Sequence, residues 1–310
     1  MRTLSSLPSH LPAQSFRFSI ADRWLATLAA SSLPLLFIVL WSSGYVAGKL
    51  ALPHTGPLTL LTLRFGLAAV VLLAVAVATR APWPQGARAW GHLAVVGLLM
   101  QVLHFSCIYF ALRGGLSAGV AGLLIGLMPL ATAAGAHLWL SERLTWRQGL
   151  GLAGGLAGVA LVIAGKPLGG SWAAYGMAGV GLLGLVAGTL YQKRFCAHMD
   201  LRSGAGVQMA VSALAVAAVA GPVEGFAIDG APELVASTLW LGLVNSIGAF
   251  SLMFVMIRRG QAGQVARLFF LIPGVSALMG FVLLGERLDA MAMAGFALSA
   301  LAVCAAAAKR

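Results

Sequence analysis

One stretch of this chain occurs twice, and the two copies keep a constant spacing of 144 residues. The residue pairs that recur at this spacing are Gly44 and Gly188, Lys49 and Lys193, Phe110 and Phe254, Pro129 and Pro273, and Glu142 and Glu286. Glu142 and Glu286 each begin the same Glu-Arg-Leu triplet. A single spacing with almost no gaps indicates a duplicated structural unit rather than chance similarity.

The composition places this duplicated unit in a membrane. Hydrophobic residues make up 60% and charged residues 9% of 310 positions, whereas soluble domains have about 25% charged residues. Apolar runs of about 20 residues recur along the whole chain, and each can cross a bilayer core of about 30 Å. The fold class predicted is therefore an all-α polytopic membrane protein.

Gly, Pro and charged residues divide the chain into ten predicted spans. They are 33–50, 57–79, 90–112, 117–140, 148–165, 172–194, 204–221, 234–256, 261–284 and 290–307. The expected organisation is a tail at 1–30, one five-helix repeat at 31–166 and another at 172–310. Because five is odd, the second repeat enters the membrane from the opposite side, which is the inverted-repeat architecture of many secondary transporters.

The distribution of Lys and Arg predicts the orientation. With the N-terminus inside, fourteen of these residues fall on the cytoplasmic side and five on the other, which satisfies the positive-inside rule with both termini cytoplasmic. The net charge of +12 then reflects topology and contact with anionic lipids, so no nucleic-acid partner is expected. The first 24 residues lack the pattern of a cleaved signal peptide.

Several motifs together resemble a known family. Trp41-Ser42-Ser43-Gly44-Tyr45, Leu63-Arg64-Phe65 and the twin Pro and Glu-Arg-Leu segments are similar to those of EamA-type exporters in the drug/metabolite transporter superfamily. The resemblance covers about 30–307. It implies ten helices in two repeats and export of amino acids, nucleosides, small metabolites or toxic compounds across the bacterial inner membrane.

Two motifs of soluble enzymes also occur, and each has a simpler interpretation. The GxGxxG patterns at 149–154 and 179–184 lie inside apolar spans, where small residues let helices approach closely. The GxSxG pattern at 115–119 would suit a membrane-embedded serine hydrolase with His104 or His137 as base. An N-cap role for Ser117 is the favoured interpretation.

Prolines and charges within the spans are candidates for conformational roles. Pro129 and Pro273 are expected to kink their helices, either as static packing features or as gating hinges beside the site. Glu142 and Glu286 end their spans next to an Arg, where ion pairing or capping is favoured over proton coupling. No Asp or Glu lies deep in any span, which argues against a buried carboxylate relay.

Two arginines lie within predicted spans. Arg64 is about 10 Å inside the second span, at an insertion cost of roughly 2.5–3.5 kcal/mol, so it either faces protein or a water-filled cavity, or it snorkels outward. Arg267 lies closer to the end of its span, and whether it favours anionic substrates is left open.

Polar and aromatic side chains at depth are the predicted substrate contacts. These residues are Trp41, Tyr45, Gln101, His104, Tyr109, Tyr191 and Asn245. The prediction is an exporter working by alternating access around a midplane site, with a passive facilitator or channel of the same fold as the alternative. The three cysteines lie in apolar runs, and no metal or cofactor is expected; a homodimer is possible.

Overall fold

The computed structural model describes residues 20–164, 171–252, 256, 268–269, 271–287 and 290–307. Arg267 and most of the predicted tail lie outside the described residues, as do the side chains before Leu33. The described helices are α1 (Ile20–Ala51), α2 (Pro57–Ala78), α3 (Gly86–Gly97), η1 (Leu98–Leu103), α4 (His104–Arg113), α5 (Ala118–Gly126), α6 (Met128–Leu140), α7 (Trp146–Ala164), α8 (Trp172–Phe195), α9 (Leu201–Glu224), α10 (Pro232–Leu239), η2 (Trp240–Ala249), α13 (Ile272–Leu284) and α14 (Ala290–Ala307). No strand occurs in these ranges.

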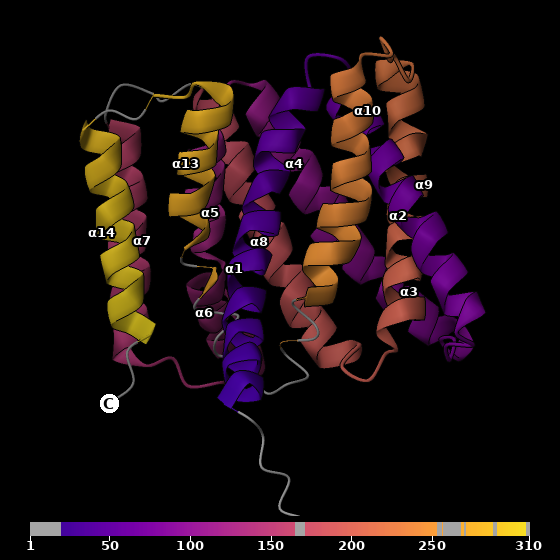
Figure 1. The fold of residues 1–310 in the computed structure, drawn as a ribbon, viewed down its shortest axis with the longest axis horizontal. Helices are drawn as coiled ribbons and strands as arrows, with labels where there is room; N and C mark the ends of the chain where they lie inside the picture. Colours follow the sequence, from indigo (N-terminus) through magenta and orange to yellow (C-terminus); the bar gives the residue numbers. More distant parts are fainter. Residues whose placement is uncertain are drawn as a thin grey trace, which may run out of the picture.

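These helices form ten segments that run up and down in alternation (Figure 1). α3, η1 and α4 follow one another without a break, as do α10 and η2, whereas α5 and α6 are two halves of one segment. Seven described helices are long and apolar enough to cross a membrane, and α13 and α14 are shorter apolar helices. The fold class predicted from the sequence is confirmed.

Several helices start where the local sequence supplies a suitable residue. α2, α10 and α13 have Pro in their first turn, where no N–H is needed. Ser171 caps α8 by accepting a hydrogen bond from the Ala174 N–H, and Asp200 caps α9 in the same way. Local chemistry therefore accounts for these five helix starts.

Equivalent helices of the two repeats pack against each other. α2 lies against α9, α7 against α14, and α5 against α13, which are the second, fifth and fourth segments of each repeat (Figure 1). The first segment of each repeat instead contacts the third segment of the other, α1 with η2 and α8 with η1 and α4. This reciprocal pattern is what a pseudo-twofold axis between the repeats requires.

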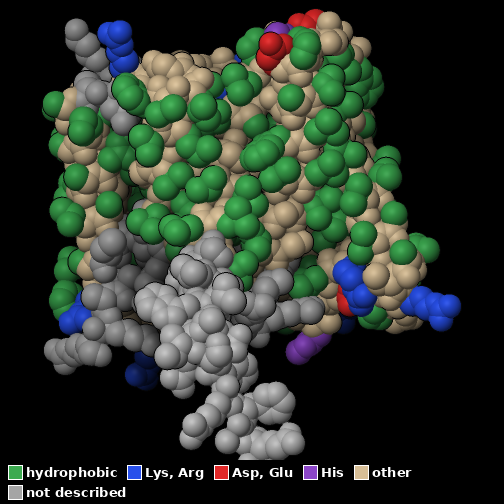
Figure 2. All heavy atoms as spheres, in the orientation of Figure 1, with side chains coloured by type: hydrophobic (Ala, Val, Ile, Leu, Met, Phe, Trp, Pro, Cys, Tyr) green, Lys and Arg blue, Asp and Glu red, His purple; other side chains and the backbone are tan. Residues whose placement is uncertain are grey.

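The surface is that of a membrane protein. A broad band of hydrophobic side chains lies between two ends where charged side chains gather (Figure 2). Leu138 is 85% and Leu214 73% exposed, which would be unfavourable in water but not in lipid. We call the end where α1 begins and α14 finishes the lower end, and the opposite end the upper end (Figure 1).

Candidate functional site

Arg64 of α2 lies at the centre of a polar cluster inside the apolar core, with only 1% of its surface exposed. Its Nη1 donates a hydrogen bond of 2.8 Å to the Tyr109 hydroxyl, and its Nε donates one of 2.8 Å to Ser246 Oγ. Its Nη2 donates one of 3.0 Å to Asn245 Oδ1. The guanidinium also lies 4.1 Å from the centre of the Phe105 ring. Arg64 therefore faces protein, and the snorkelling alternative is wrong.

We call Arg64, Phe105, Tyr109, Asn245 and Ser246 the Arg64 cluster. Its first three members belong to the first repeat, and the last two belong to η2 of the second repeat. None of the four ion pairs among the described residues includes Arg64. The positive charge is therefore held by neutral oxygens and an aromatic face, and the cluster spans the junction of the repeats.

Asn245 connects this cluster to α1. Its Nδ2 donates to the Leu40 carbonyl at 2.7 Å, a bond that fixes which end of the amide faces Arg64. A Cβ on Gly44 would lie 2.7 Å from the Asn245 amide nitrogen, so glycine is needed for this approach. The Trp41 ring packs against Phe250 and Phe269. Trp41 and Tyr45 lie buried on α1, the helix whose Leu40 carbonyl accepts the hydrogen bond from Asn245.

Both repeats carry a π-helical stretch at the same position, a feature that the sequence analysis missed. The 144-residue spacing places Gln101 of η1 on Asn245 of η2, so each stretch presents one amide side chain. π-helical turns occur often at functional sites. Hydrophobic periodicity does not distinguish a π-helix from an α-helix. The one signal in the sequence that could have drawn attention to these stretches was the equivalence of the two amides.

The predicted contact residues do not form one group. Tyr109 and Asn245 belong to the Arg64 cluster, and the His104 ring touches the Phe105 ring while its Nδ1 bonds the Gly181 carbonyl of α8 at 2.9 Å. Gln101 is buried, and its Oε1 has no hydrogen-bond partner. Tyr191 lies apart, near the end of α8, where its hydroxyl pairs with His92. The structure therefore does not bring Tyr191 together with the other candidates.

Pro129 and Pro273 interrupt their helices more strongly than a kink. α5 ends at Gly126 and α6 begins at Met128, with Leu127 at the junction and Pro129 in the first turn of α6. Pro273 holds the same place in α13. The Pro273 ring lies against Gly126, where a Cβ would meet it at 2.6 Å. The two breaks are therefore in contact across the repeats.

Glu142 and Glu286 form ion pairs, but with lysines of the opposite repeat rather than with the adjacent arginines. Lys49 Nζ lies 2.7 Å from Glu286 at the upper end, and Lys193 Nζ lies 2.5 Å from Glu142 at the lower end. Glu286 also accepts hydrogen bonds from the Ala118 N–H at the start of α5. The four residues are thus two copies of one contact, related by the 144-residue spacing.

The backbone places both glutamates in the same way. Each follows a residue in the left-handed region, Ser141 at φ 56° and Gly285 at φ 65°, which ends the helix. The Glu142 N–H then bonds the Ala136 carbonyl, and the equivalent bond holds Glu286. The upper pair is largely buried, with side chains 23% and 12% exposed, whereas the lower pair is 57% and 50% exposed. At this contact the upper end of the molecule is therefore more closed to solvent than the lower end.

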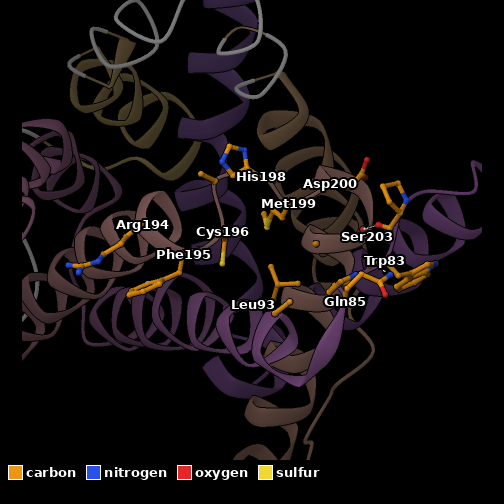
Figure 3. Close-up of a pocket in the computed structure, with 15 residues that line it drawn as sticks. Trp83, Gln85, Leu93, Arg194, Phe195, Cys196, His198, Met199, Asp200 and Ser203 are labelled. Atoms are coloured by element: carbon orange, nitrogen blue, oxygen red, sulfur yellow. Dashed lines mark hydrogen bonds between the residues drawn. The ribbon is translucent and has the colours of Figure 1, made fainter.

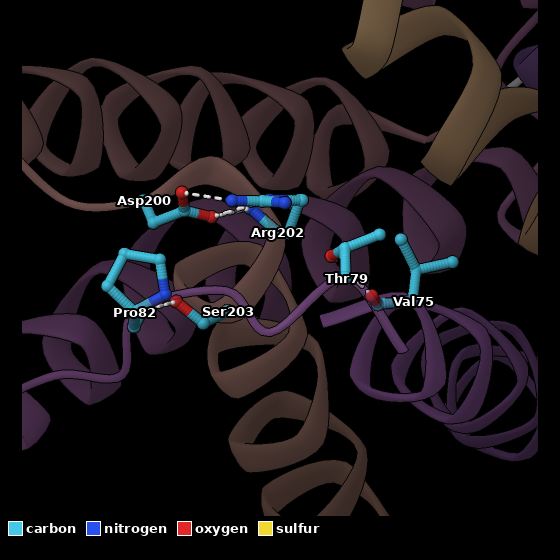
Figure 4. Close-up of polar contacts among 6 residues, drawn as sticks. All are labelled: Val75, Thr79, Pro82, Asp200, Arg202 and Ser203. Carbon is cyan, nitrogen blue, oxygen red and sulfur yellow. Dashed lines mark hydrogen bonds and ion pairs between the residues drawn. The ribbon is translucent and has the colours of Figure 1, made fainter. Parts of the chain in front are cut away.

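α2 and α9 are also joined at both ends. At the upper end, Glu224 accepts hydrogen bonds from the Leu58 and Thr59 N–H groups and from the Thr59 hydroxyl. At the lower end, the Ser203 hydroxyl donates to the Pro82 carbonyl at 2.6 Å (Figure 4). Thr59 and Ser203 are equivalent in the repeats, but their partners are not, because the residue equivalent to Glu224 is Arg80 and not Pro82.

Charged groups in the connections are paired as well. At the start of α9, hydrogen bonds from the Arg202 guanidinium lower the pKa of Asp200 (Figure 4). In the connection between α9 and α10, a hydrogen bond from His54 lowers the pKa of Asp229. Both aspartates are therefore ionised when they bind their partners, and both lie outside the membrane-spanning segments.

Ser117 has the structural role that the sequence favoured. Its Oγ accepts a hydrogen bond from the Val120 N–H and so caps α5. The two histidines considered as bases bond elsewhere, His104 to Gly181 and His137 to the Glu142 carbonyl. The arrangement required of a serine hydrolase is therefore not formed by these residues.

A surface pocket of about 370 Å³ lies at the lower end, away from the Arg64 cluster. It lies between the connection from α2 to α3 and the turn from α8 to α9, and Figure 3 shows Leu93, Cys196 and Met199 among its lining side chains. None of the predicted contact residues lines it. The described residues contain no group of three metal-binding side chains.

Comparison with known proteins gives consistent matches over most of the chain. The model of the EamA-like transporter family matches residues 28–164 and 172–307. A probable amino-acid metabolite efflux pump of Salmonella typhimurium is 28% identical, over 85% of this chain and 89% of that protein. A probable terminal-alkyne amino-acid exporter of Streptantibioticus cattleyicolor is 31% identical, over 85% and 88%.

Two further matches agree with these. The uncharacterized inner membrane transporter YedA of Escherichia coli is 25% identical, over 81% of each chain. A solved crystal structure superposes with a TM-score of 0.64 at 21% identity and covers 90% of this chain and 96% of that one. At that identity the superposition shows a shared fold.

Proposed function

Because the chain belongs to the EamA-like transporter family, we propose that it exports small amino-acid-type metabolites across the bacterial inner membrane by alternating access. It is a multi-pass membrane transporter and not an enzyme, as the family and its relatives indicate. The substrate class follows the names of two relatives, an efflux pump for amino-acid metabolites and an amino-acid exporter. The fold alone would not specify it.

The pair of cross-repeat ion pairs is the observation that supports alternating access. Lys49–Glu286 and Lys193–Glu142 join the same two repeats at opposite ends of the molecule, and they differ in burial. Two equivalent contacts at opposite ends can form in turn as one repeat rocks against the other. We propose that the repeats at 31–166 and 172–310 are the rocking units and that these contacts close the two ends.

The broken helices fit this motion. Pro129 and Pro273 lie where α6 and α13 begin, and the two breaks meet between the repeats. A helix that lacks continuous hydrogen bonding bends there at lower cost than an intact one. We propose that these breaks are the hinges, with the lower end cytoplasmic, as the excess of Lys and Arg on that side supports.

The experiment that tests this function measures export against a gradient. Cells that overexpress the chain are loaded with amino acids through hydrolysis of dipeptides, and the external concentrations are followed over time. We expect at least one amino acid to leave faster than from control cells and to reach a higher concentration outside than inside. Export that stops when the concentrations are equal would instead indicate the passive facilitator.

The closing contacts are tested by cross-linking. Cysteines replace Lys49 and Glu286 in one variant, and Lys193 and Glu142 in another, on a background that lacks native cysteines. A bifunctional thiol reagent should stop export in each variant, and reduction should restore it. If either cross-linked variant still transports at the normal rate, the ends do not need to open and alternating access is wrong.

A further inference from the structure

Among the described residues, the guanidinium of Arg64 is a permanent charge without an acidic partner. Arg keeps its proton at any physiological pH, so it cannot become neutral when buried. No Asp or Glu lies deep in a span of this sequence, and no described acidic side chain forms an ion pair with Arg64. The nearby hydroxyls, amide and Phe105 ring orient the charge but do not neutralise it. The cluster therefore favours an anion.

The hydrogen-bond geometry shows which part of Arg64 an anion would use. Nε and Nη2 lie along one edge of the guanidinium, an edge that can bind a carboxylate side-on through two parallel hydrogen bonds. Here that edge is occupied by two separate neutral oxygens, Ser246 Oγ at 2.8 Å and Asn245 Oδ1 at 3.0 Å. A carboxylate that binds these two donors would have to replace both oxygens.

Both of these oxygens come from the second repeat, whereas Arg64 and Tyr109 belong to the first. The Tyr109 hydroxyl accepts from Nη1, which is outside the carboxylate-binding edge, so it can hold the guanidinium in place throughout. Motion of η2 away from α2 would remove both neutral oxygens together and leave the edge free. A ligand that reaches Arg64 when the repeats separate would therefore find a bidentate site already oriented.

We propose that Arg64 binds the carboxylate of the exported substrate, and that Asn245 and Ser246 occupy the same edge when no substrate is bound. This assignment rests on the proposed export function and narrows it to compounds that carry a carboxylate. Substrate and the second repeat then compete for one edge of Arg64. Binding of substrate favours separation of η2 from α2 at this contact. Release of substrate allows Asn245 and Ser246 to bind Arg64 again.

The test uses the full chain reconstituted in liposomes with matched pairs of probes. The pairs are L-leucine, L-phenylalanine and L-threonine, each compared with its amide, which retains the amino group and side chain. Wild type should transport at least one acid about tenfold or more faster than its amide, since hydrogen bonds to a charged group are among the stronger ones. Equal transport of acids and amides would overturn the carboxylate site while leaving the export function intact.

Substitutions then assign the preference to Arg64. Arg64→Gln should abolish the preference for acids, and Arg64→Lys, which keeps the charge but not the planar edge, should reduce it. Arg113→Gln, at the exposed end of α4, is the matched control and should behave as wild type. If Arg64→Gln does not fold, as judged by size-exclusion chromatography, the assignment is tested by whether Arg64→Lys reduces the preference for acids. A variant at position 64 that keeps the full wild-type preference contradicts the assignment.

Failure of the export function gives a different result. If wild type transports neither member of any pair, and the cells that overexpress the chain export no amino acid either, amino-acid export is itself wrong and the carboxylate site falls with it. A purely structural tie between the repeats predicts lower melting temperatures for both Arg64 variants with an unchanged ratio of acid to amide transport. That ratio is therefore the deciding measurement.

Discussion

Gln101 and Asn245 are equivalent residues with different surroundings. Asn245 hydrogen-bonds at both ends of its amide, whereas Gln101 Oε1 is buried without a partner. A buried acceptor left unpaired costs about 1–3 kcal/mol, so its retention calls for a role beyond stability. We expect Gln101→Leu to keep or raise the melting temperature while it lowers export several-fold.

Thr132 provides a matched control for this prediction. Its Oγ1 on α6 is likewise buried without a hydrogen-bond partner, and it is not among the predicted contacts. Thr132→Val should keep stability and export alike. Wild-type export by Gln101→Leu would mean that this amide does not contact substrate.

At single residues, sequence reasoning succeeded where the physics is local. The capping preference of serine predicted the role of Ser117. The cost of a charge in lipid left two placements open for Arg64, and the structure shows the one that faces protein. The ion pairing favoured for Glu142 and Glu286 is confirmed. Their lysine partners were not predicted, because these lie 51 and 237 residues away along the chain. Only the packing of one repeat on the other brings them together.

At the scale of helices, the breaks at the two prolines lead to a paired prediction. Alanine at position 129 or 273 restores a backbone N–H and allows the helix to become continuous. We expect either variant to reach normal abundance with equal or higher thermal stability, but to export more slowly. Pro222→Ala, in the last turn of α9, is the control and should export normally. Export that falls only in proportion to the amount of protein would identify the breaks as static packing features.

Close packing of α7 on α14 gives a prediction about stability. A Cβ on Gly158 would lie 2.6 Å from the Gly295 carbonyl, whereas a Cβ on Gly149, in the same helix, would meet nothing within 4 Å. We expect Gly158→Ala to destabilise the protein by about 1–3 kcal/mol through overpacking, seen as a lower melting temperature. Gly149→Ala should not destabilise it. Equal effects would mean that helix propensity, and not contact, governs these sites.

Most helix boundaries could be predicted to within a few residues, because apolar length and the punctuating residues determine them. The span predicted at 57–79 is the helix Pro57–Ala78 in the structure, and the span predicted at 172–194 is the helix Trp172–Phe195. The backbone changes inside the spans were not predicted in full. The π-helical stretches η1 and η2 have ordinary apolar sequences, and their geometry depends on neighbouring helices.

At the scale of the whole molecule, the ten-segment arrangement gives a topology prediction. The start of α1 and the end of α14 lie at the same end, with the connection from α8 to α9 (Figure 1). The Lys and Arg excess predicts that this end is cytoplasmic. Alkaline phosphatase fused at the C-terminus or at Gly204 should be inactive, and phosphatase fused after Glu224 should be active. Activity of the C-terminal fusion would contradict this orientation.

The inverted pair of repeats could be predicted from the sequence because the spacing of 144 residues is nearly free of gaps. What could not be predicted is how differently the equivalent positions are surrounded. The residue equivalent to Arg64 is Gln208, whose amide lies 3.6 Å from the Met199 sulfur and carries no charge. At this pair of equivalent positions, only the first repeat carries a charge.

This inequality bears on why the two units share one chain. Two identical five-helix subunits, inserted in opposite directions, would place an arginine at both equivalent positions beside one axis. Like charges in a medium of low dielectric constant repel strongly. In a single chain the two equivalent positions can differ, and here they are Arg64 and Gln208. Covalent linkage thus permits a lone cation at the junction, which a symmetric homodimer could not contain without its duplicate.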